Sequence, residues 1–202
     1  MHYRLGVAEV VFGKLPRVAA AQRARDLGFG YIDVAGDDDE VLALPVGDRS
    51  WQRPRRGYST GAPAEAPGVW ERAVNAYRRE PGARIEAWPG SIIDSVEKIV
   101  AFMQEAPGTR LLLDTGHVAT WGEDPAELVR FAGHVQLRQA KKGVPQAREG
   151  EVDMRSFIGS LRRAGYEGSV SVEYLDIPEM GFPLDDPVAY AVDLAEKVRP
   201  FL

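Results

Sequence analysis

The sequence predicts an α/β protein, a (β/α)8 barrel of the TIM type that is shortened in its N-terminal half. From residue 83 onward, short apolar strand-like runs alternate with helical patterns, which is typical of a parallel sheet. Four of these runs end in a carboxylate or amide side chain. The chain has 202 residues, whereas a complete barrel typically needs about 250. We therefore expect one domain, residues 1–202, with seven or eight strands and fewer helices than strands.

The first 36 residues follow a strand–helix–strand pattern. Residues 3–13 form an apolar run that ends in glycine, and residues 15–30 carry apolar side chains at helical spacing before a Gly-Phe-Gly stop. Residues 31–36 form a second short strand-like run. The short connections between these elements indicate parallel strands.

Residues 36–68 interrupt this rhythm. They are rich in glycine, proline and charge, and they contain at most one or two short strands, such as residues 41–46. A segment of this length without regular structure is unusual in a compact domain. Its basic run, residues 49–56, has the chemistry to bind phosphate or carboxylate, but a solvated charge run is the favoured interpretation. Since neighbouring strands would lose their covering helices here, we expect a homodimer or a higher homo-oligomer.

The second half of the chain is regular. Proline in a first turn, small polar residues before apolar stripes and glycine stops mark the helices, and Ser91 is the expected cap of one of them. The expected order is helix 67–82, strand 83–88, helix 91–105, strand 110–115, helix 124–132, strand 134–139, helix 153–164, strand 169–174 and helix 185–198.

Composition excludes several classes of protein. A net charge of −5 and a pI near 5.3 argue against a general nucleic-acid partner, which requires a basic face. The chain has no cysteine, so disulfides and thiolate metal sites are excluded. No apolar run reaches the length of a membrane span, and the N-terminus lacks the apolar core of a signal peptide. We expect a cytoplasmic protein with no membrane partner.

Four oxygen-bearing side chains define the candidate site. Glu86, Asp114, Gln136 and Glu173 lie near the C-terminal ends of four successive predicted strands. These ends converge in a parallel barrel. Three carboxylates and one amide oxygen are hard ligands for a divalent cation, with Mn²⁺ or Mg²⁺ preferred and Zn²⁺ or Co²⁺ left open. Any one of them alone would be a turn or cap residue, but the matching positions on four strands favour a metal site.

Other polar and aromatic residues near the strand ends keep two interpretations each. His117 either contributes beside the metal or opens the following loop, and the first is favoured. Trp88 belongs either to the core or to a wall against the substrate. His134 is expected to be a buried, hydrogen-bonded histidine below the site, and Asp33 and Glu9 to be structural or to contact substrate.

Several motifs carry a resemblance to a known family. The segments EAWPGSIIDSVEKIV, LLLDTGHV and HVQLRQAKKG, and the pairing of EGEVD with L-x-x-x-GYEGSVSVEY, resemble the xylose isomerase-like TIM-barrel superfamily of sugar isomerases and epimerases. The resemblance spans roughly Glu86 to Tyr174. It implies a divalent metal ion held by Glu86, Asp114, Gln136 and Glu173, with glutamine at the third position as in hydroxypyruvate isomerase-like members.

The same resemblance implies roles for further residues. His117 and Arg138 would touch the substrate, and Glu86 and Glu173 would double as acid and base. The related apurinic endonuclease group requires a cluster of histidines for several zinc ions, and the three histidines of this chain do not supply it.

Three functions follow as hypotheses. The leading one is a divalent-metal-dependent isomerase or epimerase of a sugar or hydroxy-keto acid, in which proton transfer passes through an enediolate and a small carbohydrate-like molecule is the substrate. The second is a metal-dependent lyase or dehydratase that uses the same site. The third is a non-catalytic, barrel-derived binding protein. A metal assay separates the third hypothesis from the other two.

Overall fold

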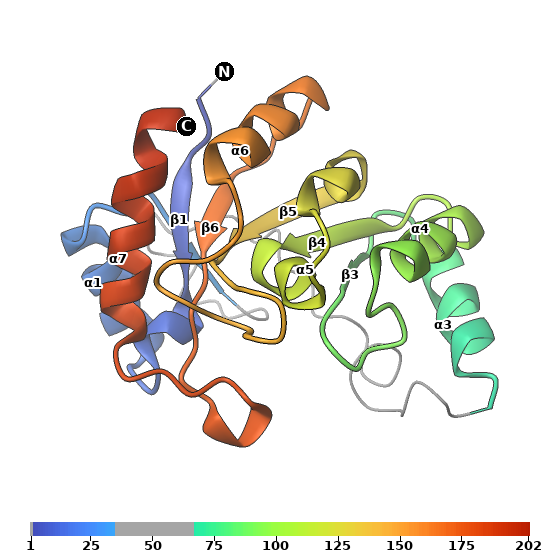
Figure 1. The fold of residues 1–202 in the computed structure, drawn as a ribbon, viewed down its shortest axis with the longest axis horizontal. Coiled ribbons are helices and arrows are strands. Elements are labelled where there is room, and N and C mark those ends of the chain that lie inside the picture. Colours follow the sequence, from blue (N-terminus) through green and yellow to red (C-terminus); the bar gives the residue numbers. More distant parts are fainter. Residues whose placement is uncertain (1, 35–66) are drawn as a thin grey trace.

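The computed structural model describes residues 2–34 and 67–202, and its centre is one parallel sheet. Six strands pair in the order β2-β1-β6-β5-β4-β3, and every pairing is parallel (Figure 1). The sheet curls into half of a barrel, which confirms the predicted TIM-type α/β fold and its shortening. The strands are β1 (Leu5–Ala8), β2 (Ile32–Asp33), β3 (Arg84–Glu86), β4 (Arg110–Asp114), β5 (Ala132–Leu137) and β6 (Val170–Val172).

Helices cover the outer side of the curled sheet. Figure 1 shows α1 and α7 beside β1 at one end, and α3 and α4 beside β3 at the other. The α-helices are α1 (Arg17–Asp26), α3 (Val69–Arg78), α4 (Val96–Glu105), α5 (Thr115–Trp121), α6 (Met154–Arg163) and α7 (Pro187–Val198). The 3₁₀ helices are η1 (Glu9–Phe12), η2 (Pro125–Phe131), η3 (Pro178–Met180) and η4 (Arg199–Phe201).

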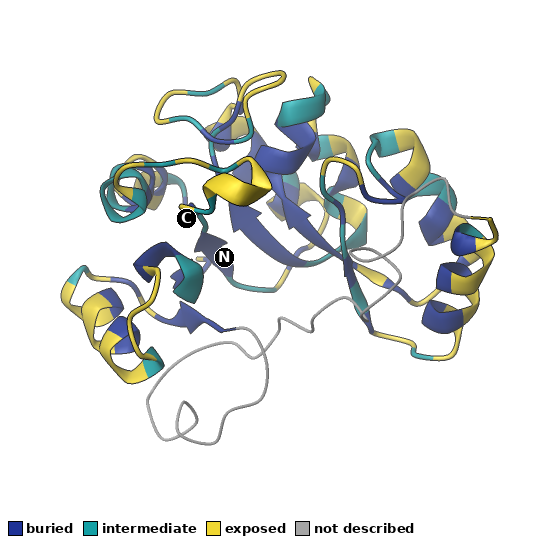
Figure 2. Cartoon of the chain, turned by 90° about the horizontal axis from the view of Figure 1, so that it is seen from below, coloured by how far each residue is buried: buried dark blue, intermediate teal, exposed yellow. Residues whose placement is uncertain are grey.

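The core lies between the sheet and the inner faces of these helices. Figure 2 shows buried strands and helices that are exposed only on their outer sides. The apolar stripe of α4 places Ile99 and Phe102 in the core, both fully buried. The Phe102 ring meets Tyr77 and Trp70 of α3 edge-on, with both centroid distances at 5.5 Å. Aromatic packing therefore joins α3 to α4.

Several element boundaries differ from the sequence prediction, and two of them change how a residue is interpreted. The first strand ends at Ala8, and the chain turns at once into η1. The helix expected from residue 91 begins at Val96 instead, and its cap is Ser95, whose Oγ accepts a hydrogen bond from Lys98 N at 3.2 Å. Ser91 is therefore not the cap; its Oγ accepts hydrogen bonds within a tight turn, including one from Ile93 N at 3.3 Å.

Several predictions concern residues outside the described ranges. The short strand at 41–46, the basic run at 49–56, and the gap in helix cover with the self-association inferred from it all fall on residues that the structure does not describe. The described residues supply six strands of the seven or eight expected for the barrel. Among the described helices, none has the length and apolar character needed to cross a bilayer.

Candidate metal centre

The four predicted ligand residues stand at one end of neighbouring strands. Glu86 and Asp114 are the last residues of β3 and β4, Gln136 is next to last in β5, and Glu173 directly follows β6. Asp114 is the register partner of Gln136 across β4 and β5. Gln136 Nε2 donates a hydrogen bond to Glu173 Oε1 at 3.1 Å. The parallel pairing thus brings side chains from four separate segments to one edge of the sheet.

Asp114 also begins a helix that the sequence did not predict. Its Oδ1 accepts hydrogen bonds from Gly116 N at 2.7 Å and His117 N at 3.3 Å, so it caps α5. Because α5 starts directly after β4, His117 lies in its first turn and not in a loop. His117 Nε2 is 3.6 Å from Asp114 Oδ2 and 3.5 Å from Glu86 Oε1.

Three of these side chains form a compact ligand group. Glu86, Asp114 and His117 each offer one ligand atom, and these atoms lie within 4.8 Å of one another. His117 therefore lies at the cluster, as its favoured interpretation requires.

A buried arginine contacts two members of this cluster. Arg138 follows β5 and is fully buried, and its Nη2 donates to Asp114 Oδ2 and lies 3.1 Å from His117 Nε2. The guanidinium stands 5.3 Å from the ring centroid of Phe182, whose ring meets His117 edge-on at 5.9 Å. Two of its other nitrogens, Nε and Nη1, have no hydrogen-bond partner. One positive charge is thus held among the carboxylates.

Two carboxyl groups of the candidate site have opposite pKa shifts. Burial raises the pKa of Asp114, but the guanidinium of Arg138, the neighbouring His117 ring and the hydrogen bond from Gly116 N together outweigh burial and hold that pKa below its usual value. Burial raises the pKa of Glu173 well above its usual value; Arg138 opposes this rise, and the negative charges of Asp114 and Glu86 add to it. The environment therefore favours the charged form of Asp114 and penalises the charged form of Glu173.

This donor set fits a divalent cation. Gln136 is 3% exposed, and its Oε1 is a buried acceptor without a hydrogen-bond partner. Such an orphaned oxygen is rare in folded proteins and calls for a partner. Glu86 and Asp114 add further hard oxygen ligands, and His117 adds a nitrogen, which keeps Zn²⁺ and Co²⁺ open beside Mn²⁺ and Mg²⁺. Glu173 is not a member of this compact group, and its Oε1 accepts the hydrogen bond from Gln136 Nε2.

A separate polar network lies beside the cluster. Asp33, at the end of β2, accepts a hydrogen bond from Ser171 Oγ at 2.7 Å on its Oδ2, and the same oxygen pairs with His134 Nε2. His134 Nε2 is also 3.2 Å from Ser171 Oγ. All three residues are buried. This is the buried, hydrogen-bonded histidine that the sequence predicted, and it ties β2 to β5 and β6.

The chain matches a family of known proteins. A family model described as a xylose isomerase-like TIM barrel matches residues 69–198, which include all four strand-end residues. The chain belongs to this family. A comparison with curated protein sequences found no match.

Solved structures share the fold of this family member at low sequence identity. A xylose isomerase-like TIM barrel protein from Mycobacterium smegmatis in complex with magnesium has a TM-score of 0.70 at 13% identity, over 98% of this chain and 96% of that one. D-allulose 3-epimerase from Methylomonas sp. has a TM-score of 0.68 at 17% identity, over 100% of both chains. A probable 3-DHS dehydratase from Bacillus anthracis has a TM-score of 0.60 at 14% identity, over 98% of both chains.

Two cavities flank the candidate site of this xylose isomerase-like barrel. One, of about 470 Å³, is lined by Gln136 and Glu173. The other, of about 440 Å³, is lined by Trp88 and Phe182, and the Phe182 ring contacts His117. Trp88 is partly exposed and lines this cavity.

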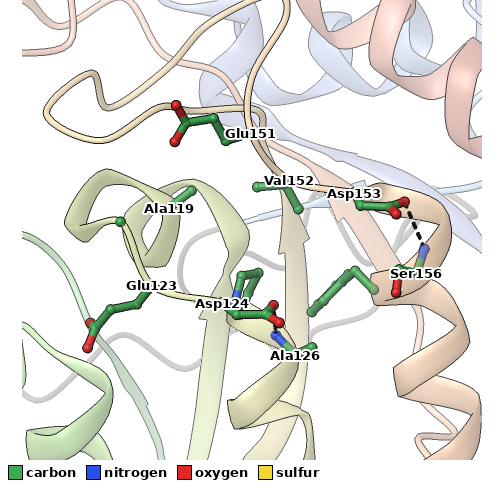
Figure 3. A pocket seen from close by; sticks show the side chains of 11 residues that line it. Ala119, Glu123, Asp124, Ala126, Glu151, Val152, Asp153 and Ser156 are labelled. Carbon is green, nitrogen blue, oxygen red and sulfur yellow. Dashed lines mark hydrogen bonds between the residues drawn. The ribbon is translucent and has the colours of Figure 1, made fainter.

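A third cavity, of about 320 Å³, is built from helix caps (Figure 3). Asp124 Oδ1 accepts from Ala126 N at 2.8 Å, and Asp153 Oδ1 accepts from Ser156 N at 3.0 Å, so these carboxylates begin η2 and α6. Glu123 Oε2 likewise accepts from a backbone N–H. Structural hydrogen bonds account for this acidic group, and we assign it no chemistry.

Sequence reasoning missed one contributor to the candidate site. Phe182, whose ring meets His117 edge-on and lies against the Arg138 guanidinium, comes from an irregular loop after η3, and no periodic pattern marked it. Ser171 lies two residues before Glu173, so the alternation of side chains already places it on the same face of the strand.

Proposed function

We propose that this chain, as one domain, is a divalent-metal-dependent isomerase or epimerase that moves a proton next to the carbonyl of a small sugar or hydroxy-keto acid. The observation that carries the proposal is the cluster of Glu86, Asp114 and His117 beside the orphaned amide oxygen of Gln136. Glu86, Asp114, Gln136 and Glu173 would hold the cation, with His117 next to it. When bound, the cation would stabilise the negative charge that develops on substrate oxygens.

The residues of the chain divide the remaining work. Glu86 and Glu173 come from β3 and the end of β6, at opposite sides of the cluster along the sheet, so one would remove a proton and the other would return it. Asp114, fixed by its helix-capping bonds, would keep the ligand geometry rigid. His117 and Arg138 would orient substrate oxygens through their N–H groups, and Trp88 would line the apolar wall.

A dehydratase is the second candidate. The fold similarity to a probable 3-DHS dehydratase supports it. The same proton abstraction would then be followed by loss of water from the neighbouring carbon. Product analysis separates the two, because an isomerase or epimerase conserves the mass of the substrate and a dehydratase lowers it by one water.

The first test is metal uptake. Purified protein loaded with Mn²⁺ and desalted should retain the ion, and Asp114→Ala should abolish retention. The matched control is Asp94→Ala, which removes a carboxylate that pairs with Lys98 on the surface and should leave retention unchanged. Equal retention by wild type and Asp114→Ala would remove this cluster from consideration, and no retention by wild type would favour the binding-protein hypothesis.

The second test is proton transfer. Metal-loaded protein incubated with ketoses or hydroxy-keto acids in D₂O should place deuterium on the carbon next to the carbonyl. Glu173→Gln keeps an oxygen ligand but removes the base, so exchange should fall by about 10²-fold or more while metal is partly retained. The exposed Glu167→Gln is the control. Exchange that survives Glu173→Gln unchanged assigns the base to another residue.

A further inference from the structure

The loop between β5 and α6, residues 138–153, contacts the chain directly after Glu173. Gln146 of this loop is buried, with 7% of its surface exposed. Its Nε2 donates a hydrogen bond to Leu175 O at 2.7 Å, and its Oε1 accepts one from Leu175 N at 3.2 Å. One amide side chain therefore satisfies both main-chain polar groups of Leu175, as a residue of a neighbouring strand would.

This pairing begins where the sheet ends. The strand β6 ends at Val172, and Glu173 N donates to Leu137 O of β5 at 3.1 Å. Beyond that point, main-chain groups that pair only with water would leave the segment free to open locally. Gln146 instead continues the hydrogen bonding of β6 past the end of the strand.

The residue between Glu173 and Leu175 is held by the same loop. Tyr174 is fully buried, and its hydroxyl donates to Ala147 O at 3.1 Å and accepts from Gln139 N at 3.1 Å. Three consecutive residues are thus fixed, Glu173 by the sheet and the next two by the loop. Because the backbone of Glu173 sets the direction of its Cα–Cβ bond, the loop also restricts where its carboxyl group can lie.

We propose that Gln146 is a positioning residue, which holds the Glu173 carboxyl group at the proposed metal site by pairing with the main chain of Leu175. This inference rests on the proposed function, since it explains how one residue of that site keeps its place. Residues that orient a metal ligand in this indirect way typically change metal affinity by about 10–100-fold when they are removed.

The same loop offers a matched control. Gln139 Nε2 donates to Val152 O at 2.8 Å, and its Oε1 accepts from Val152 N at 3.2 Å. This is the same type of pairing, but its partner lies at the far end of the loop, just before α6. Gln146→Met and Gln139→Met each remove two hydrogen bonds from a side chain of similar size, so both should lower the unfolding temperature by similar amounts.

The first measurement is Mn²⁺ affinity, followed through the electron paramagnetic resonance signal of the free ion. Gln146→Met should bind Mn²⁺ about ten-fold or more weakly than wild type. Gln139→Met should bind it as wild type does, although its loss of stability is similar. A purely structural role for Gln146 would give the two variants the same affinity.

The second measurement requires no metal. Hydrogen exchange of individual amides, followed by NMR in EDTA, reports local opening of the chain. Gln146→Met should speed exchange at the amide of Glu173 as well as at that of Leu175. Gln139→Met should speed exchange at the amide of Val152 and leave that of Glu173 protected.

The outcomes separate this inference from the proposed function. If wild type binds no Mn²⁺, both fail. If wild type binds Mn²⁺ but the two variants bind it equally well, or the Glu173 amide stays protected in Gln146→Met, only the positioning role fails. Should Gln146→Met not fold, Gln146→Asn takes its place, because it keeps the amide but shortens the side chain. Wild-type affinity in Gln146→Asn would then overturn the inference.

Discussion

Arg138→Met should destabilise the metal-free protein by about 3 kcal/mol near neutral pH. The Arg138 guanidinium is fully buried against Asp114, and removing one partner of a buried ion pair typically costs about 3–5 kcal/mol because the other charge stays buried. The lower end applies here, since Nε and Nη1 of Arg138 lack hydrogen-bond partners and their removal offsets part of the loss. For a chain of this length the change corresponds to a decrease in Tm of roughly 6–12 °C.

The loss should depend on pH in a defined direction. The pKa of Asp114 is held below its usual value, so the ion pair contributes stability above the unfolded-state pKa of about 3.9 and loses it as pH falls through the lower folded-state pKa. The difference between wild type and Arg138→Met should therefore be largest above about pH 5 and shrink on acidification.

A divalent ion should compensate for the missing charge. Saturating Mn²⁺ is expected to raise the unfolding temperature of Arg138→Met more than that of wild type, since it binds the folded state and replaces the lost positive charge. Thermal unfolding followed by circular dichroism, in EDTA and in Mn²⁺, measures both effects. Arg163→Met, an exposed arginine that donates to Ser160 Oγ at 2.7 Å, is the control and should change stability by less than about 0.5 kcal/mol.

A steric variant tests the same contact without deleting the charge. A Cβ on Gly116 would lie 2.5 Å from Arg138 Nε and 2.9 Å from its Cγ, so Gly116→Ala must push the guanidinium away from Asp114. Gly116→Ala should therefore show part of the loss of stability that Arg138→Met shows in the absence of metal. Arg138 does not stand in for a cation if Arg138→Met loses no more stability than Arg163→Met. The same holds if Arg138→Met loses as much stability with Mn²⁺ as without it.

Two further predictions concern the stability of the fold. Burial raises the pKa of Tyr174 to about 12. Because the tyrosine of the unfolded chain ionises near pH 10, the free energy of unfolding should fall by about 3 kcal/mol between pH 10 and 12. Denaturant titrations of Tyr174→Phe should show a shallower fall over this range. Asp153→Ala removes the hydrogen bond that caps α6 and should cost about 1 kcal/mol by thermal unfolding, against a negligible change for the exposed Glu151→Ala.

The strand-end residues could be predicted because they follow from simple periodicity. Strand runs from residue 83 onward are bounded by glycine stops and helix caps, so the end of each strand, and with it Glu86, Asp114 or Glu173, is visible in the chain. The alternation of side chains also placed Arg138 on the face of Gln136. The alternation did not predict which residue Arg138 contacts, because its side chain is drawn to Asp114, a charged residue on the neighbouring strand β4.

The helix α5 shows why the rest of the site could not be predicted from the sequence. Its seven residues include Thr115 and Val118, β-branched residues with low helix propensity. Its cap, Asp114, was interpreted as a metal ligand, and no second start signal follows it. The helix is stabilised by its environment, since Thr115 Oγ1 donates to Arg138 O at 2.9 Å and most of its side chains are buried. Such tertiary support leaves no local pattern.

The charge on the cluster links the buried arginine to the proposed metal. Arg138 pairs with Asp114, and the negative charges of Asp114 and Glu86 add to burial in raising the pKa of Glu173. If Asp114 and Glu173 bind a cation as proposed, the Arg138 ion pair would have to weaken and any proton on Glu173 would have to leave first. Both steps would subtract from the intrinsic affinity, and the second would make the affinity rise with pH. The arginine that stabilises Asp114 without metal would therefore also lower the affinity of the proposed enzyme for its metal.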